Sequence, residues 1–358
     1  MTWLTWRQFR AQAITAVAAL AAFAILLAVT ESHMASLYAA SGISGCHSGT
    51  CAGLASQFLQ DLTSGHSFPL LPDGSDPYVI VYFLSVLAIL TAPAIIGIFW
   101  GAPMIARELE TGTCRLAWNQ SVTRTRWLAV KLTLIGVAAM AVTETFSLLQ
   151  AWWAAPIGKA VGLGGSASIL TEGRFGPFVF STHGITPLGY AAFGFALGVT
   201  AGLLIRRAIP AMAVTLAIFA VVQLVTPLWI RPHLLPSDRT IATIAAAGAT
   251  AYPVGSTIAI TAAAVPGQPG AWTISSAAVT TAGQPASLPA ACESAIPRGQ
   301  GGSPALDSCL ASHGIRVAVS YQPVGRYWPL QSAETGLFLA LALALAGFCF
   351  WRLGRRTS

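Results

Sequence analysis

The chain has 358 residues, of which 55% are hydrophobic and only 9% are charged, and its mean hydropathy is +0.67. A soluble globular domain carries about 25% charged residues, so this composition excludes a disordered chain, a coiled coil and a nucleic-acid-binding domain. A protein with several membrane-spanning helices remains. The meaning of its net charge of +7 then depends on the side of the membrane on which the charged residues lie.

Six segments are long and apolar enough to span a bilayer, whose core of about 30 Å requires about 20 residues of helix. They are Ala11–Thr30, Tyr78–Trp100, Trp127–Leu149, Thr186–Ile205, Ala208–Ile230 and Ala333–Trp351. The sequence therefore predicts an all-α polytopic membrane protein with six transmembrane helices.

The N-terminus also has features of a secretory signal, because Arg7 and Arg10 precede an apolar run. That run is longer than the apolar part of a signal peptide, and Trp3, Trp6 and Phe9 are interspersed with the arginines. We therefore expect an amphipathic interfacial segment that leads into an uncleaved helix.

The basic residues predict the orientation of the spans, since cytoplasmic loops are enriched in Lys and Arg. If the N-terminus is cytoplasmic, 12 of the 19 Lys and Arg residues but only two of the 12 acidic residues fall on the cytoplasmic side. Every short basic loop then lies on that side, whereas Arg231 falls outside. We expect both termini in the cytoplasm.

This topology divides the chain into three parts. Residues 1–230 hold the first five spans, and residues 333–358 hold the sixth span and a basic tail. Residues 231–332 form a large extracytoplasmic insertion between spans five and six. Three alternating runs predict that the insertion is a small β or irregular domain. They are Ser256–Val265, Ala271–Thr281 and Ile315–Pro323. The Ala-rich segment Ile241–Ala251 is more helix-like, but it is too short and too interrupted by glycine to span a membrane.

The cysteines follow the same division between compartments. They are Cys46, Cys51, Cys114, Cys292, Cys309 and Cys349. The first two share one outside loop, Cys292 and Cys309 share the other, and the remaining two fall on the reducing side. Because disulfides form in oxidising compartments, we expect the bridges Cys46–Cys51 and Cys292–Cys309. The alternative for the first pair is a metal site with His47, but no fourth ligand is evident, so no metal site is predicted.

The most charged short stretch is the predicted cytoplasmic loop 104–126. Glu108 and Glu110 form an acidic turn, and a basic run follows it. A short helix along the membrane with this charged face would suit docking of a soluble partner by complementary charge. Equally, the basic residues could act only as determinants of topology.

This stretch resembles the segment after the second span of ABC-2 type permeases, the membrane subunits of ATP-binding-cassette exporters. In that family a run of the form R-E-x-E-x-G-T, then a basic Ser/Thr-Arg segment and a Lys, precede the third span. Here the run is Arg107–Thr113, followed by Ser121–Trp127 and Lys131. The six spans, the amphipathic N-terminal segment and the large outside loop also match. The Ala-rich, Lys-poor composition is similar to that of actinobacterial proteins, which implies a bacterial plasma membrane.

The resemblance implies a permease subunit that couples ATP hydrolysis by a separate ATPase to export of a hydrophobic or amphipathic substrate. The permease would be a homodimer or a heterodimer with another permease. This chain has no G-x-x-x-x-G-K-[ST] loop, since GLGGSAS at Gly162 lacks the lysine. ATP and magnesium are therefore expected on the partner, and no cofactor on this chain. The residues expected to couple to the ATPase are Arg107, Glu108, Glu110, Gly112, Thr113, Arg115, Arg124 and Arg126.

Other classes of function stay open. Glu144 lies within the third span, where a carboxylate is costly and often functional. It could face a substrate path, pair with a basic group or serve a proton-coupled carrier. Alternatively, it could be protonated or hydrogen-bonded to Thr143, Thr145 or a neighbouring helix. A membrane scaffold, a sensory subunit or an immunity subunit is a further alternative. An enzyme is not expected, because all six histidines fall outside and no H-E-x-x-H motif accompanies them.

Small residues in two spans could permit close helix packing or dimer contact, or could simply face lipid. They are Gly194, Gly198, Gly202 and Gly347.

Overall fold

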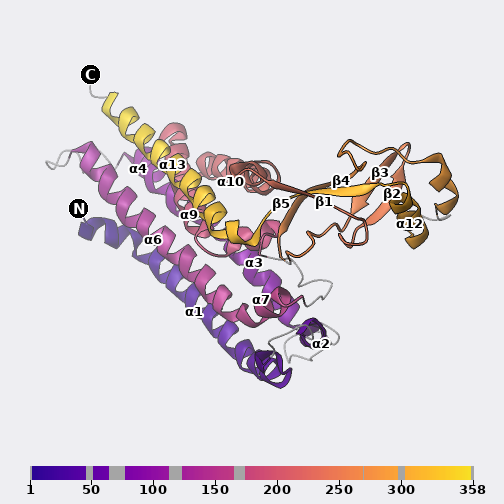
Figure 1. Ribbon diagram of the computed structural model, residues 1–358. Coiled ribbons are helices and arrows are strands. Elements are labelled where there is room, and N and C mark those ends of the chain that lie inside the picture. Colours follow the sequence, from indigo (N-terminus) through magenta and orange to yellow (C-terminus); the bar gives the residue numbers. More distant parts are fainter. Residues whose placement is uncertain are drawn as a thin grey trace. The chain divides into compact units, whose positions relative to one another are not determined.

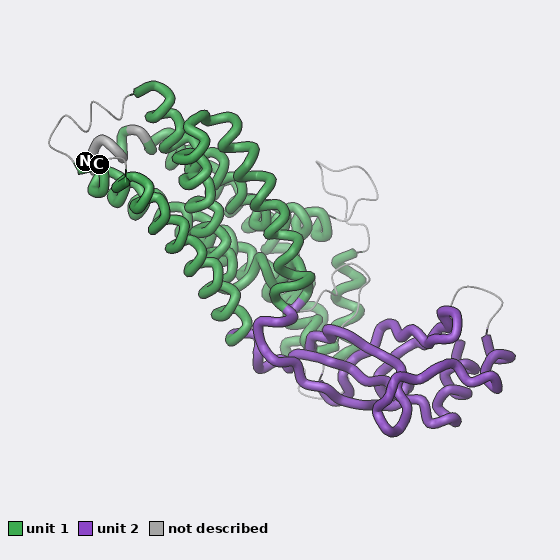
Figure 2. The backbone as a smooth tube through the Cα atoms, turned by 90° about the horizontal axis from the view of Figure 1, so that it is seen from above, with its two compact units in different colours: residues 1–172, 176–231, 329–358 green, residues 173–175, 232–328 purple. Residues whose placement is uncertain are grey.

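The computed structural model describes residues 2–45, 51–63, 77–112, 123–164, 174–268, 270–296 and 303–355. The chain forms two compact units (Figure 2). The helical unit comprises Met1–Glu172, Gly176–Arg231 and Pro329–Ser358. The β-rich unit comprises Gly173–Phe175 and Pro232–Trp328.

Long helices dominate the helical unit (Figure 1). The first are α1 (Thr2–Ala40), α2 (Cys51–Thr63), α3 (Pro77–Ile96), α4 (Ala102–Thr111) and α6 (Arg124–Trp153). They are followed by α7 (Ala155–Gly162), α8 (Pro177–Thr182), α9 (Thr186–Ile205), α10 (Ala208–Val225), α11 (Arg231–Leu234) and α13 (Tyr327–Gly354). The π-helical segments η2 (Gly97–Gly101) and η3 (Thr226–Ile230) continue α3 and α10.

Among the residues that the structure describes, six helical segments are long and apolar enough to cross a membrane, as the sequence predicts. They are Phe9–Ala40, Pro77–Thr111, Arg124–Trp153, Thr186–Ile205, Ala208–Leu234 and Val324–Gly354. Several extend beyond their apolar cores. In particular, the second runs on through η2 and α4, so part of the predicted loop 104–126 is a continuation of a spanning helix.

The helix ends gather into two groups, as expected of antiparallel neighbours. One hydrophobic cluster includes Phe9, Ile105, Trp127, Leu203 and Leu353. It therefore joins the start of α1 and α6 to the end of α4, α9 and α13. We call this group of helix ends the arginine-rich end, because Arg7, Arg10, Arg107, Arg124, Arg126, Arg206, Arg207, Arg352 and Arg355 lie in or beside its helices. A second cluster, with Leu27, Tyr78 and Trp153 among its members, lies toward the opposite ends of α1, α3 and α6.

Proline shapes the junction between α3 and α4. Pro103 lacks the N–H that would reach the Phe99 carbonyl oxygen in a regular α-helix. The Gln12 side chain of α1 donates to that oxygen instead, at 3.0 Å. At its other end α4 stops at Gly112, whose φ of 69° is the left-handed conformation that glycine adopts without steric cost.

Helix α9 is the central helix, since 83% of its 18 most apolar consecutive residues are buried. Its residues Gly194, Gly198 and Gly202 face the α3–η2–α4 segment, which contributes Gly97 and Gly101. A Cβ at Gly198 would lie 2.1 Å from the Gly97 carbonyl oxygen, and one at Gly97 would lie 2.5 Å from that of Gly194. The two backbones are therefore in direct contact, which only glycine permits. The predicted close packing is confirmed for these three residues of α9.

The β-rich unit contains a sheet with strand order β1-β5-β4, built from β1 (Asp238–Ala242), β4 (Trp272–Val279) and β5 (Arg316–Gln322). Both pairings are antiparallel, with Thr240 opposite Val319 and Ala277 opposite Ala318. Strands β2 (Thr250–Val254) and β3 (Thr257–Thr261) form a hairpin. The three predicted β runs are confirmed as β3, β4 and β5. The helix-like segment Ile241–Ala251 instead contains the end of β1, a turn and the start of β2.

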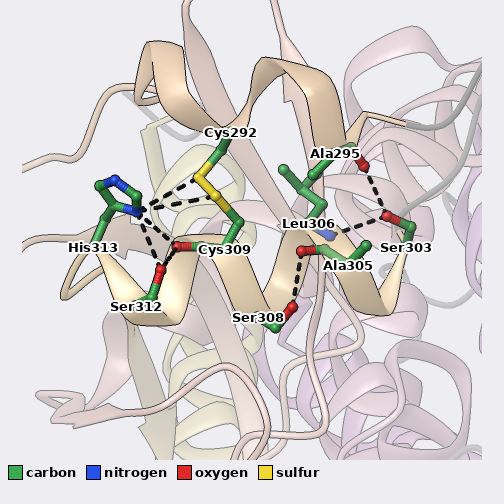
Figure 3. Close-up of a disulfide and its surroundings, with 9 residues drawn as sticks. All are labelled: Cys292, Ala295, Ser303, Ala305, Leu306, Ser308, Cys309, Ser312 and His313. Carbon is green, nitrogen blue, oxygen red and sulfur yellow. Dashed lines mark hydrogen bonds between the residues drawn. A yellow bond between two sulfur atoms is a disulfide. The ribbon is translucent and has the colours of Figure 1, made fainter.

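A disulfide joins Cys292 of the short helix η4 (Ala290–Ala295) to Cys309 of α12 (Pro304–Ser312), as predicted (Figure 3). Cys292 is fully buried in the core of the unit. His313 Nδ1 lies 3.7 Å from Cys292 Sγ, but sulfurs bonded to each other are not thiolate ligands for a metal. Cys46 and His47 lie outside the described residues, so the Cys46–Cys51 bridge stays a prediction.

The glycine contact predicts that a Gly→Ala substitution lowers the stability of the protein at one position but not at another. Gly198→Ala should destabilise the protein by about 1–3 kcal/mol, the usual effect of overpacking, because the new methyl group meets backbone. Gly347→Ala is the matched control, since nothing lies within 4 Å of its Cβ position. Thermal unfolding in detergent should show a lower Tm for Gly198→Ala alone. Equal Tm values would contradict the contact.

Candidate functional site

Six of the eight predicted coupling residues lie in or near α4 and the start of α6, at the arginine-rich end. Arg107, Glu108 and Glu110 are on α4, and Gly112 terminates it. Two more of these residues, Arg124 and Arg126, lie in the first turn of α6, where the Thr123 side chain accepts a hydrogen bond from the Arg126 N–H. Thr113 and Arg115 lie outside the described residues. The described part of the charged stretch is thus presented by the end of α4 and the start of α6.

Glu108 forms an ion pair with Lys131 of α6. The Lys131 side chain is only 5% exposed and that of Glu108 is 16% exposed. The Lys131 ammonium also lies 4.9 Å from the centre of the Trp127 ring. A buried ammonium requires a partner to offset its lost hydration. The pair therefore connects the end of α4 to the first two turns of α6.

Glu110 contacts a different helix. Its Oε2 accepts from the backbone N–H of Ala208, the first residue of α10, at 3.5 Å. The first N–H groups of a helix have no partner within the helix, and the positive end of the helix dipole favours a carboxylate there. Arg206 just before this helix adopts a left-handed φ of 58° that turns the chain from α9 into α10. Helix α4 therefore contacts α6 through Glu108 and α10 through Glu110.

A cavity of about 280 Å³ lies beside α4. The polar side chains of Gln12, Arg107, Glu108 and Lys131 contribute to its lining. It is therefore formed by α1, α4 and α6 of the helical unit, at the place where predicted coupling residues on α4 meet the first turns of α1.

A second charged pair is buried deep in the helical unit, away from the arginine-rich end. Arg231 of α11 and Glu334 of α13 are both 0% exposed. The guanidinium donates to both carboxylate oxygens, at 2.8 and 3.0 Å. It also donates to Ser181 at 2.6 Å and lies 4.2 Å from the centre of the Phe180 ring. Such bidentate geometry is the strongest form of an arginine–carboxylate interaction.

Further hydrogen bonds extend this pair into a network. The Tyr190 hydroxyl of α9 donates to Glu334 at 2.8 Å. One turn before Glu334, the fully buried Gln331 accepts from the Ile185 and Thr186 N–H groups and donates to the carbonyl oxygens of Phe180 and His183. The start of α13 is thereby fixed to α8, α9 and α11.

Sequence reasoning did not identify this network. Arg231 is the first residue after the fifth predicted span, and Glu334 is the second residue of the sixth. Opposite charges at the facing ends of the two spans that an insertion connects are the signal that could have revealed the pair.

Glu144 is not part of either charged group. It lies 13 residues beyond Lys131 on α6, which corresponds to about 20 Å along the helix. Its Oε2 is buried and has no hydrogen-bond partner among the residues that the structure describes. The same holds for Thr143 Oγ1, while Thr145 donates to the Ala141 carbonyl oxygen. The hydrogen bond from Glu144 to a neighbouring threonine is therefore not seen.

The buried Arg231–Glu334 pair predicts that replacing one partner destabilises the protein more than replacing both. Glu334→Leu should destabilise the protein by about 3–5 kcal/mol, because it leaves the Arg231 guanidinium buried without its carboxylate. The double variant Arg231→Met/Glu334→Leu should recover much of this loss. The readout is Tm in detergent. A double variant no more stable than the single variant would contradict the prediction.

Comparison with known protein families gives a match that lies mainly in the helical unit. A family model described as ABC-2 membrane transporter related matches residues 17–231, more than half of the chain. No curated protein and no solved structure matches the chain. The matched range holds α4 with Arg107, Glu108 and Glu110, and it ends at Arg231. With six helices suited to crossing a membrane, the chain is a multi-pass membrane protein that belongs to the ABC-2 membrane transporter related family.

Proposed function

We propose that this chain is the permease subunit of an ATP-binding-cassette exporter and that a separate ATPase docks on α4. Membership of the family implies such an ATPase partner. The observation that carries the proposal is the position of α4. Glu108 connects it to α6, Glu110 connects it to α10, and glycines place it directly against α9. A force applied to α4 would therefore reach three other helices through direct contacts.

The arginines support the proposed orientation of the protein. The ends that gather at the arginine-rich end carry most of the short basic segments, and cytoplasmic segments are enriched in such residues. We therefore place α4 and both termini in the cytoplasm, where an ATPase is available. The β-rich unit, with its disulfide, then lies outside the cell, where a disulfide is stable.

The remaining parts of the transporter come from partners. ATP and magnesium would bind the ATPase, and a second permease, either the same chain or a homologue, would complete the pathway. The apolar spans suit a hydrophobic or amphipathic substrate. Charged side chains within the spans are few, and the Arg231–Glu334 pair already satisfies two of them.

The docking proposal is tested by reversing exposed charges on α4. Arg107→Glu and Glu110→Lys change exposed side chains, so neither should unfold the protein. Together they should reduce co-purification of the ATPase about tenfold, because the charges at the contact would no longer be complementary. Glu293→Lys, at an exposed position of the β-rich unit, is the control. Undiminished association of the double variant would refute docking on α4. Association without ATP-dependent transport would favour a scaffold or sensory subunit.

A proton-coupled carrier is the second candidate, and it is favoured by the buried Glu144 oxygen, which has no hydrogen-bond partner in the described part of the chain. Glu144→Gln keeps the shape of the side chain but removes its titration. If ATP drives export, vesicles with this variant should retain most of their ATP-dependent transport and lose it when the ATPase is inactivated. Transport that survives ATPase inactivation in the unmodified protein, but disappears in Glu144→Gln, would favour the carrier.

A further inference from the structure

The cavity beside α4 has one apolar side and one polar side. Phe9, Pro103, Met104 and Ile135 form the apolar side, and the first and last of these are only 3% and 4% exposed. The polar side carries the Arg107 guanidinium and the Glu108–Lys131 ion pair. Two cations and one carboxylate leave a formal charge of one positive unit. A ligand that fits both sides is an amphiphile with an anionic head.

The surroundings of the cavity fit a molecule that enters from the bilayer. Phe9 begins the first candidate span. About one and two turns further along α1, Ile14 and Val17 are 65% and 64% exposed, as expected of side chains that face lipid. Arg7 and Arg10, which flank Phe9 closely in the sequence, are exposed and add positive charge. The cavity therefore lies where an apolar surface gives way to a basic one, which is the level of lipid headgroups.

We propose that this cavity binds one anionic phospholipid. Its phosphate would lie against Arg107 and Lys131, and the first carbons of an acyl chain would pack on Phe9, Met104 and Ile135. A volume of about 280 Å³ is near the lower limit of small-molecule sites, about 300–1,000 Å³. It therefore accommodates the headgroup and the start of a chain, while the rest of the lipid stays in the bilayer.

The lipid would add a partner to the proposed coupling site. Since the cavity is formed by α1, α4 and α6, an occupant would link the amphipathic N-terminal segment to the same helix that Glu108 connects to α6. Binding of the lipid does not require the ATPase. Only its consequence for coupling rests on the proposed function.

The test measures lipid binding to the full-length permease, purified without an ATPase, by native mass spectrometry. The probes are phosphatidylglycerol and the zwitterionic phosphatidylcholine. Phosphatidylglycerol should be retained preferentially. Arg107→Gln should weaken its binding about fivefold, the effect expected of one basic residue near an anionic headgroup. Met104→Trp should also weaken it, because the larger side chain fills the apolar side. Arg355→Gln is the control, an exposed arginine at the end of α13, and should leave binding unchanged.

Several results would overturn the proposal. Unchanged binding in both Arg107→Gln and Met104→Trp would show that the lipid lies elsewhere. An equal loss in Arg355→Gln would mean that the arginine-rich end attracts anionic lipid without a defined site. Competition by millimolar inorganic phosphate, with no contribution from the acyl chain, would indicate a phosphate site rather than a lipid site. ATPase co-purification, measured separately, distinguishes failure of this proposal from failure of docking on α4.

Discussion

The contact between α9 and the α3–η2–α4 segment depends on the absence of side chains. Gly198 approaches the Gly97 carbonyl oxygen so closely that a Cβ would lie 2.1 Å from it. In a bilayer the hydrophobic effect does not drive helices together, so association depends on close packing and polar contacts. This contact sets the position of α4, and the position of α4 in turn decides which helices Glu108 and Glu110 can reach. The candidate site is thus a consequence of glycine packing within the spans.

A buried ion pair lies in the helical unit at the two points where the chain leaves this unit and returns to it. Arg231 is the last residue of the helical unit before the β-rich unit, and Pro329, five residues before Glu334, is the first after it. A bidentate ion pair fixes the two crossing segments to each other and to α8 and α9. A buried pair of this kind contributes little net stability compared with apolar packing, but it penalises any arrangement that separates its members. Within the helical unit, it therefore specifies the position of Arg231 relative to the α13 residues around Glu334.

Much of the fold could be predicted because its signals are local. Uninterrupted apolar runs predict spans, and alternating runs such as Ala271–Thr281 predict strands. The charged residues of α4 were also evident, since Glu108 and Glu110 lie in the chain's most charged short stretch. Their partners were not, because no local pattern indicates that Glu108 meets Lys131, 23 residues away, or that Glu110 meets the start of α10. The same reason hid the Arg231–Glu334 pair, whose members are 103 residues apart.

The geometry of α4 also limits how the proposed coupling could work. A motion that pulled α4 away from α9 would open a gap between two backbones, and glycines have no side chains to fill it. Bending at η2 would break the hydrogen bond from the Gln12 side chain to the Phe99 carbonyl oxygen. This hydrogen bond takes the place of the one that Pro103 cannot donate. Motions that keep both contacts move α3, α4 and α9 as one body. Helices α6 and α10 would move with them, because Glu108 and Glu110 connect α4 to these two helices. Rotation of this group of helices, rather than displacement of a loop, is therefore the movement that the packing favours.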